Sequence, residues 1–212
     1  SYITALDNNG NPIAAGSAQV LPGFGPQSAT NESRHNVAIF AEFDTYLTDK
    51  WNVVLASRYE DYSDFGNTFT SKLATRYSIT DNLSLRGAAS TGFRAPSLAQ
   101  SSYRQISTIL ENNQPFEVGL FPSSAPAAQA LGAKQLDAED SVNVTAGFVY
   151  TQGGFSLTVD AYRIDIDDRI VLSENLSGNA VQQILANAGE LNTESVRYFT
   201  NAINSRTQGV DI

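Results

Sequence analysis

The sequence predicts an all-β chain, folded as an antiparallel up-and-down meander of about seven strands. Apolar residues recur at every second position in several segments between residues 36 and 212. Turn-forming residues separate neighbouring segments, and the connections alternate between about four residues and several dozen. A period of two, interrupted by turns, is typical of antiparallel strands whose two faces meet different surroundings.

The first four strands lie between Asn36 and Pro96, at about 36–47, 52–60, 72–79 and 83–90. In the first of these, Val37, Ile39, Ala41 and Phe43 alternate with polar or larger residues. The segments 47–53 and 79–85 are near copies of each other, separated by the length of one hairpin. This internal period favours a meander with tight turns at one end.

Three further strands are predicted at 141–150, 155–170 and 198–212. The segments 97–137 and 173–197 read as long loops, and the second contains a helical spacing that predicts a short surface helix at 179–188. Short turns alternating with long connections are typical of outer-membrane β-barrels. We therefore expect both long loops at one end of the sheet and the tight turns at 48–50, 80–82 and 151–154 at the other.

The two faces of the predicted strands differ sharply in charge. One face carries only uncharged, mainly apolar residues, whereas the opposite face carries the charged residues Glu42, Asp44, Arg58, Glu60, Lys72, Arg76, Arg86, Glu139 and Asp160. A lipid-facing surface excludes Arg or Lys by about 2–4 kcal/mol at mid-depth, so the charged set is predicted to face a polar lumen. Simple neutralisation between neighbouring strands is an alternative, with Arg58 beside Glu42 and Asp44, and Glu60 beside Lys72 and Arg76.

Aromatic residues gather near both ends of the predicted strands. Tyr46, Trp51, Tyr77, Tyr150 and Phe155 lie near the tight turns, and Tyr59, Tyr62, Phe65, Phe69 and Phe93 lie toward the long loops. Amphipathic rings suit the two headgroup levels of a membrane, although soluble β-proteins also place aromatic residues at strand ends.

Composition excludes several classes of function. The net charge of −9 disfavours nucleic acid as a partner. One histidine and no cysteine exclude most catalytic triads and transition-metal sites, so we expect no enzyme, no metal and no cofactor. No apolar run approaches the length of a transmembrane helix, and strands with alternating residues do not need one.

Four local motifs have a functional and a plain interpretation. The segment Asp7 to Asn11 resembles the start of a calcium loop, but its twelfth position is Ala18, which favours a solvated turn. The carboxylates of Asp165, Asp167 and Asp168 could hold a divalent cation, but their spacing does not support a cage and favours a solvated strand end. The segment 23–26 lacks the third glycine of a dinucleotide loop, and His35 reads as a polar residue where a strand begins.

Six segments, in order, resemble TonB-dependent outer-membrane receptors. The segment 91–97 resembles the family's Gly-Phe-Arg-Ala-Pro signature, and 58–66 resembles its Arg-Tyr-Asp-Asp-Tyr-Ser segment. Further similarities lie at 40–49, 138–141, 159–170 and 201–211. The resemblance covers residues from about 36 to 212.

This resemblance implies a partial transmembrane β-barrel at 36–212, preceded by an extracellular loop at 1–35. The family's barrel has 22 strands, and its plug domain, TonB box and barrel termini are not recognisable in this chain. The implied function is TonB-energised uptake of a scarce solute of siderophore, cobalamin or oligosaccharide type across the outer membrane of a Gram-negative bacterium. The implied partners are outer-membrane lipid, the receptor's own plug domain, TonB and the solute. Arg94, at the loop mouth, is expected to anchor the loop that follows it or to contact the plug or the solute.

Two other classes of function stay open from the sequence. A soluble β-sandwich binding module would bury the apolar face against a second sheet, and an outer-membrane enzyme would need a nucleophile–base pair that the sequence does not show. If the chain is one wall of a larger barrel, the strands 36–47 and 198–212 should not hydrogen-bond to each other. Ala56, Ala74 and Ala88 are then expected on the concave side.

Overall fold

The computed structural model of this chain describes residues 28–111, 114–190 and 193–212. The chain divides into two compact units. Residues 32–101, 135–171 and 199–212 form a sheet unit, and the described parts of 102–134 and 172–198 form a smaller connection unit. The predicted turn at 7–11 and the segment 23–26 lie outside the described residues.

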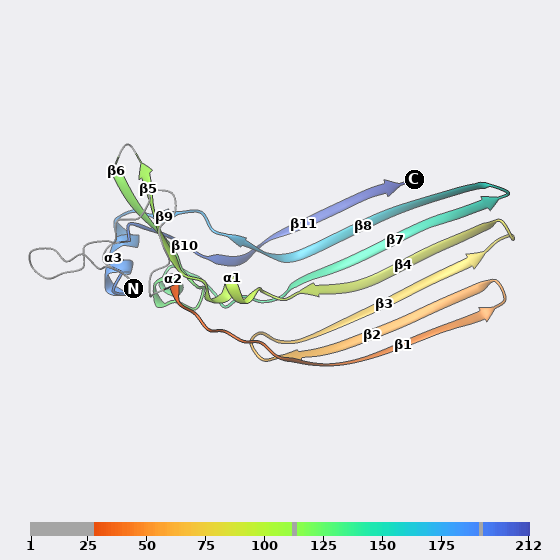
Figure 1. Cartoon of the computed structure of the whole chain (residues 1–212), viewed down its shortest axis with the longest axis horizontal. Coiled ribbons are helices and arrows are strands. Elements are labelled where there is room, and N and C mark those ends of the chain that lie inside the picture. The colour runs from red at the N-terminus through yellow and green to blue at the C-terminus, as the bar shows by residue number, and fades with distance from the viewer. Residues whose placement is uncertain (1–27, 112–113, 191–192) are drawn as a thin grey trace, which may run out of the picture. The chain divides into compact units, whose positions relative to one another are not determined.

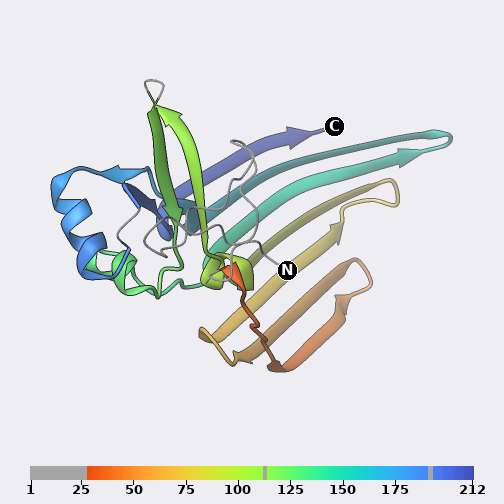
Figure 2. The same ribbon diagram turned by 60° about the vertical axis from the view of Figure 1, so that its left-hand side comes forward.

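The sheet unit consists of seven long strands in the order β1-β2-β3-β4-β7-β8-β11 (Figures 1 and 2). Their bounds are Asn36–Thr48 (β1), Trp51–Tyr62 (β2), Gly66–Ser78 (β3), Leu83–Arg94 (β4), Glu139–Gln152 (β7), Phe155–Leu172 (β8) and Phe199–Asp211 (β11). Neighbouring strands from β1 to β8 in this order pair antiparallel. The predicted seven-stranded meander is confirmed.

The tight turns and the long connections leave the sheet at opposite ends, as predicted. The turns after β1, β3 and β7 lie at one end (Figure 1). The connections that follow β4 and β8 begin at the other end, where Arg94 pairs with Glu139. Strands β1 and β11 are the two edges of the sheet and do not pair with each other, so the sheet is not closed within the described residues.

The register sorts the side chains into an apolar face and a polar face. Directly paired residues of an antiparallel sheet share a face. Ala56 pairs with Glu42 and Lys72, and Ala74 pairs with Ala88, so these three alanines lie on the polar face. The apolar face exposes large side chains from six strands, including Val37, Ile39, Phe43, Leu55, Phe69, Leu73, Leu85, Val142, Val144 and Val210.

The aromatic residues near the strand ends are divided between these faces. Trp51 pairs with Tyr77 on the apolar face. Tyr46, in contrast, pairs with Asn52, and the Tyr62 hydroxyl donates to Glu60, so both rings belong to the polar face. The strand period places these two rings away from the apolar face.

The long connections contain secondary structure that the sequence pattern did not predict. The connection unit holds a four-stranded sheet of order β5-β6-β10-β9, with strands Gln105–Glu111 (β5), Gln114–Leu120 (β6), Leu176–Ser177 (β9) and Ser195–Arg197 (β10). It also holds the helices α2 (Pro126–Ala130) and α3 (Asn179–Asn187), whereas the helix α1 (Leu98–Ser102) lies almost wholly in the sheet unit. Helix α3 confirms the predicted surface helix. The expectation that 97–137 and 173–197 are long loops, with one short helix in the second, is wrong because both segments also contribute strands to a sheet.

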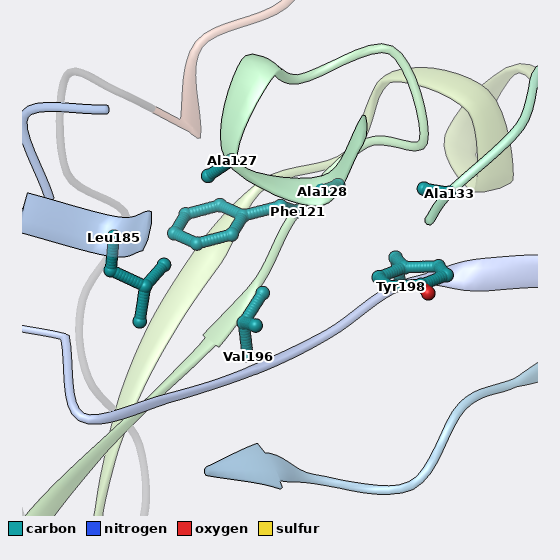
Figure 3. Close-up of a cluster of buried hydrophobic side chains, with 7 residues drawn as sticks. All are labelled: Phe121, Ala127, Ala128, Ala133, Leu185, Val196 and Tyr198. Carbon is teal, nitrogen blue, oxygen red and sulfur yellow. The ribbon is translucent and has the colours of Figure 1, made fainter. Parts of the chain in front are cut away.

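The connection unit has its own apolar core (Figure 3). The Phe121 ring and the side chains of Leu185 and Val196 are almost completely buried, and they pack with alanines of the α2 region and with Tyr198. Strand β10 pairs in parallel with β6, which joins the two long connections in one sheet. This core explains why segments so distant in sequence fold together.

Side chains replace backbone pairing where β8 leaves its ladder with β7. Asp168 has a positive φ of 54°, a conformation that interrupts a regular strand. Its N–H donates to Asn204 Oδ1 at 3.1 Å, and its carbonyl accepts from Asn201 Nδ2 at 2.7 Å. The polar backbone groups of this bulge are therefore satisfied by side chains of β11.

Strands β3 and β4 separate toward the end with the long connections. Their backbone ladder extends from Ser78 and Ser84 only to Lys72 and Ser90, although both strands continue. The first group beyond it, Ser71 N–H, donates to Thr91 Oγ1 at 3.0 Å.

In the described part of the chain, none of the helices has the length and hydropathy to cross a membrane.

Candidate functional site

The polar face of the sheet unit is the candidate functional surface. The register brings to this one face all nine charged residues predicted for it, together with Arg94. They form a wall that extends from β1 to β8 rather than a single compact site. Their individual partners show what the wall can do.

Arg86 and Asp160 form an ion pair that spans an intervening strand. Arg86 on β4 pairs with Gly147 on β7, and Gly147 pairs with Asp160 on β8. Arg86 Nε donates to Asp160 Oδ1 at 2.8 Å, and a terminal nitrogen donates to the second carboxylate oxygen. The bridge needs glycine at 147, because a Cβ there would lie 2.2 Å from Asp160 Oδ1 and 2.3 Å from the Val159 carbonyl oxygen.

Glu60 is buried at the end of β2 with three donors around it. It accepts from Arg58, from the Tyr62 hydroxyl and, at 3.4 Å, from Asn36 Nδ2. This arrangement corrects the predicted neutralisation between strands. Arg58 pairs with Phe40 instead of Glu42 or Asp44 in the register, so its carboxylate partner comes from its own strand.

The remaining charges of the wall have few partners. Asp44 accepts from Asn52 Nδ2 at 2.6 Å, and Arg76 donates to Ser84 Oγ at 3.3 Å. Within the described residues, Glu42 and Lys72 have no hydrogen bond or ion pair, although they flank Ala56 in the same row. These charges are left available to water or to a solute.

Arg94 joins three strands instead of projecting freely from the loop mouth. Arg94 Nε donates to Glu139 Oε2 at 2.9 Å, and the Ile170 N–H donates to Glu139 Oε1 at 2.8 Å. The Glu139 carboxylate is buried. The Gly-Phe-Arg-Ala-Pro segment therefore ends β4 in a polar junction with β7 and β8.

Arg34 forms a second junction at the same end, which sequence reasoning missed. Its guanidinium makes a bidentate contact with Asp64 and also donates to the Pro96 carbonyl. It lies over the rings of Tyr62 and Phe65, 5.8 and 5.2 Å from their centroids. The junction ties the chain entering β1 to the β2–β3 turn and to the end of β4.

A hollow of about 640 Å³ lies on the polar face over β4, β7, β8 and β11. Its lining is polar apart from one isoleucine: Arg86, Asn143, Thr145, Asp160, Tyr162, Ile164, Thr207 and Asp211. Gly209 contributes to the space, because a Cβ there would lie 2.6 Å from the Tyr162 hydroxyl. The hollow thus presents the charges of Arg86 and Asp160 together with hydroxyl and amide groups, while most of its exposed surface is carbon.

The hydrogen bonds of Asp165 and His35 explain two of the weaker sequence motifs. Asp165 accepts from Arg163 and Arg206 instead of joining a carboxylate cage with Asp167 and Asp168. Among the described residues, no three His, Cys, Asp or Glu side chains are placed to hold a metal ion. The backbone of His35 bonds to Ser63, which is the strand-entry position expected for it.

The connection unit has a separate charged cluster. Arg104 donates to Glu190 and lies 4.7 Å from the centroid of the Phe121 ring. On β6, burial raises the pKa of the Glu117 carboxyl above its ordinary value, and the nearby Glu194 carboxylate adds to this rise. Glu194 in turn accepts the Glu117 N–H at 3.2 Å.

Comparison with known proteins shows to which protein family this chain belongs. The family model described as TonB dependent receptor-like, β-barrel, matches residues 2–212. The chain belongs to this TonB-dependent receptor family. The expectation drawn from the six resembling segments is confirmed.

Two curated relatives show how much of a TonB-dependent receptor the chain covers. It is 24% identical over 141 residues to the ferric enterobactin receptor PirA of Pseudomonas aeruginosa, which is 66% of this chain and 18% of PirA. It is 27% identical over 147 residues to the ferrienterobactin receptor of Escherichia coli, which is 68% of this chain and 19% of that receptor. The chain thus spans about a fifth of the length of these relatives.

Solved receptor structures share the fold. The crystal structure of the siderophore receptor PirA from P. aeruginosa has a TM-score of 0.67 at 20% identity, over 87% of this chain and 32% of that one. PirA from Acinetobacter baumannii has a TM-score of 0.63 at 22% identity, over 89% of this chain and 27% of that one. The seven-stranded sheet therefore corresponds to part of a TonB-dependent receptor barrel.

We predict that Gly147→Ala destabilises the complete receptor by about 1–3 kcal/mol, because the new methyl group collides with Asp160 and with the β8 backbone. Gly87→Ala is the matched control in the neighbouring strand, since its Cβ meets only the Thr145 carbonyl oxygen at 3.5 Å. Urea unfolding of both variants in lipid vesicles measures the difference. Equal stability would show that Gly147 is not needed for the Arg86–Asp160 bridge.

Glu117 should make the stability of the connection unit depend on pH. Its pKa is higher in the folded than in the unfolded chain, so the folded state gains stability as pH falls and loses it as pH rises through the raised pKa. We expect Glu117→Gln to increase hydrogen-exchange protection of β6 and β10 at pH 7, and this gain to vanish below the ordinary glutamate pKa. Glu174→Gln, at an exposed position, is the control. The same gain at both pH values would contradict this assignment.

Proposed function

We propose that this chain forms part of the barrel wall of an outer-membrane receptor that takes up a ferric siderophore in a Gram-negative bacterium. Uptake would be energised through TonB, with the plug domain and TonB as partners through other parts of the receptor. The polar face would line the lumen, and the apolar face would contact lipid. The protein would act as a transport receptor rather than as an enzyme.

The observation that carries this proposal is the exposed apolar face of the sheet. Val37 and Ile39 are more than 70% exposed, and large apolar side chains continue across the neighbouring strands on the same face. A soluble β-sandwich would bury such a face under a second sheet, but the described part of the chain supplies no such cover. A bilayer would cover it and would favour the separation of apolar from charged positions.

The names of the relatives support a siderophore as the solute. Two curated relatives are named as receptors for ferric enterobactin, and one solved receptor structure of this fold holds enterobactin. The polar hollow and the partnerless Glu42 and Lys72 would give a hydrated solute, or a moving plug, a wettable surface to pass. The connection unit, at the end of two strand pairs, would then be extracellular.

We predict that Ala146→Arg is far more damaging than Thr145→Arg in the complete receptor. The two neighbours on β7 point to opposite faces, so only the first substitution would place a cation in lipid. The difference in unfolding free energy should be about 2–4 kcal/mol in bilayers. Equal stability of both variants in refolding titrations would argue against a lipid-facing apolar surface.

Uptake and topology test the proposal in cells. Deletion of the complete receptor gene should abolish growth on a ferric siderophore as the sole iron source, and the intact gene should restore it. Protease added to intact cells should cut within 97–137 and 173–197 but not at the turns 48–50, 80–82 and 151–154. Cleavage at the tight turns would show that the topology is the reverse of the proposed one. If the deletion strain still takes up iron from every member of a panel of ferric siderophores, the proposed solute class is refuted.

A further inference from the structure

Charged residues interrupt the apolar face on β8, which corrects the prediction that this face carries no charge. Val159 and Ala161 belong to this face, and the next position on it is Arg163, followed by Asp165. The register pairs Arg163 with Val144 and Asp165 with Val142, both of which are exposed on the apolar face. These charges therefore lie on the surface that the proposed function turns toward lipid.

The three charged side chains form one network between β8 and β11. Arg163 Nε donates to Asp165 Oδ2 at 2.7 Å, and Arg206 Nε donates to Asp165 Oδ1. The arginine side chains are 49% and 57% exposed, whereas Asp165 is 26% exposed. In the described part of the chain, these guanidiniums make no other hydrogen bond, so their terminal nitrogens keep their donors for an outside partner.

The network lies at the border of the apolar face, and this border is oblique to the strands. On β8 the charges begin after Ala161, which pairs with Ala146. On β7 the apolar positions continue through Val142 before Asp140 follows. On β4 they continue to Phe93, which pairs with Asp140. A border that shifts from strand to strand is expected where tilted strands cross a flat layer.

We propose that Arg163 and Arg206 bind the phosphate of an anionic lipid headgroup at the border of the membrane, on the side of the long connections. This inference rests on the proposed membrane function. The planar guanidinium matches phosphate oxygens with paired donors, and two such groups converge here beside an exposed apolar surface that would hold the acyl chains. Asp165 holds both Nε groups and leaves their terminal nitrogens to the ligand.

The neighbouring acidic residues fix the direction of approach. Asp140 and Asp167 pair with each other on the same face, one step farther from the apolar band than Asp165. They would repel a phosphate arriving from the side of the long connections. A lipid would therefore approach laterally within the membrane, with its acyl chains along the apolar band and its phosphate at the level of the arginines.

The test uses the complete receptor, purified in a neutral detergent and titrated with phosphatidic acid. Native mass spectrometry reports retained lipid, and thermal unfolding reports stabilisation. We expect the wild type to bind phosphatidic acid but not diacylglycerol, and Arg163→Gln/Arg206→Gln to bind it at least about tenfold more weakly, as expected for lost charge-assisted hydrogen bonds. The double variant leaves the Asp165 carboxylate without its two arginine partners. A triple variant that also carries Asp165→Asn removes this charge and should bind phosphatidic acid as weakly as the double variant.

Controls separate this site from unspecific charge effects. Lys50→Gln removes a positive charge from the tight turn at the opposite end and should leave binding unchanged. Asp167→Asn should bind at least as tightly as the wild type. Equal binding by the wild type and the triple variant would overturn the inference, and so would equal stabilisation by inorganic phosphate alone. Iron uptake and outer-membrane fractionation of the wild type test the proposed function separately. If the wild type takes up iron and lies in the outer membrane but does not bind phosphatidic acid, the lipid site is refuted and the proposed function is not.

Discussion

Strict alternation of side chains along the long strands is the constraint on which the rest of the molecule depends. Because neighbouring residues of a strand face opposite ways, each ladder carries an apolar row and a polar row at once. Glu42, Lys72 and Ala56 share one side, while Phe43, Leu55 and Leu73 share the other. A shift of register by one residue would exchange the two environments along a whole strand, so the pairing and the segregation of charge stabilise each other.

Where the chain leaves this regular sheet, polar side chains take over the role of the backbone ladder. Glu139 accepts the Ile170 N–H, and Asn201 and Asn204 satisfy the backbone of Asp168. Arg94 and Arg34 bring charge to two such junctions. These junctions hold the strand ends from which the long connections depart. They also explain why polar residues concentrate at this end of the sheet.

The sequence predicted the seven strands, their turns and the charged face, since all three follow from a local period of two. It did not predict the sheet of the connection unit, because the pairing of Gly119 with Val196 joins segments far apart in the chain and leaves no periodic signal. The Arg34–Asp64 contact was invisible for the same reason. The partner of Arg86 was missed because the bridge depends on an absent side chain at Gly147. Local patterns thus predict faces, whereas partners depend on the register across several strands.

The separation of β3 and β4 beyond Lys72 and Ser90 has a consequence for immersion depth. Backbone groups that turn toward a gap between strands need another partner, and hydrocarbon offers none. Water can reach such groups only above the acyl chains, so the gap would emerge from the bilayer. Phe69, which is exposed on the apolar face beside the gap, would then sit at the level of the headgroups. The position at which β3 and β4 separate would therefore indicate how deeply the sheet is inserted in the membrane.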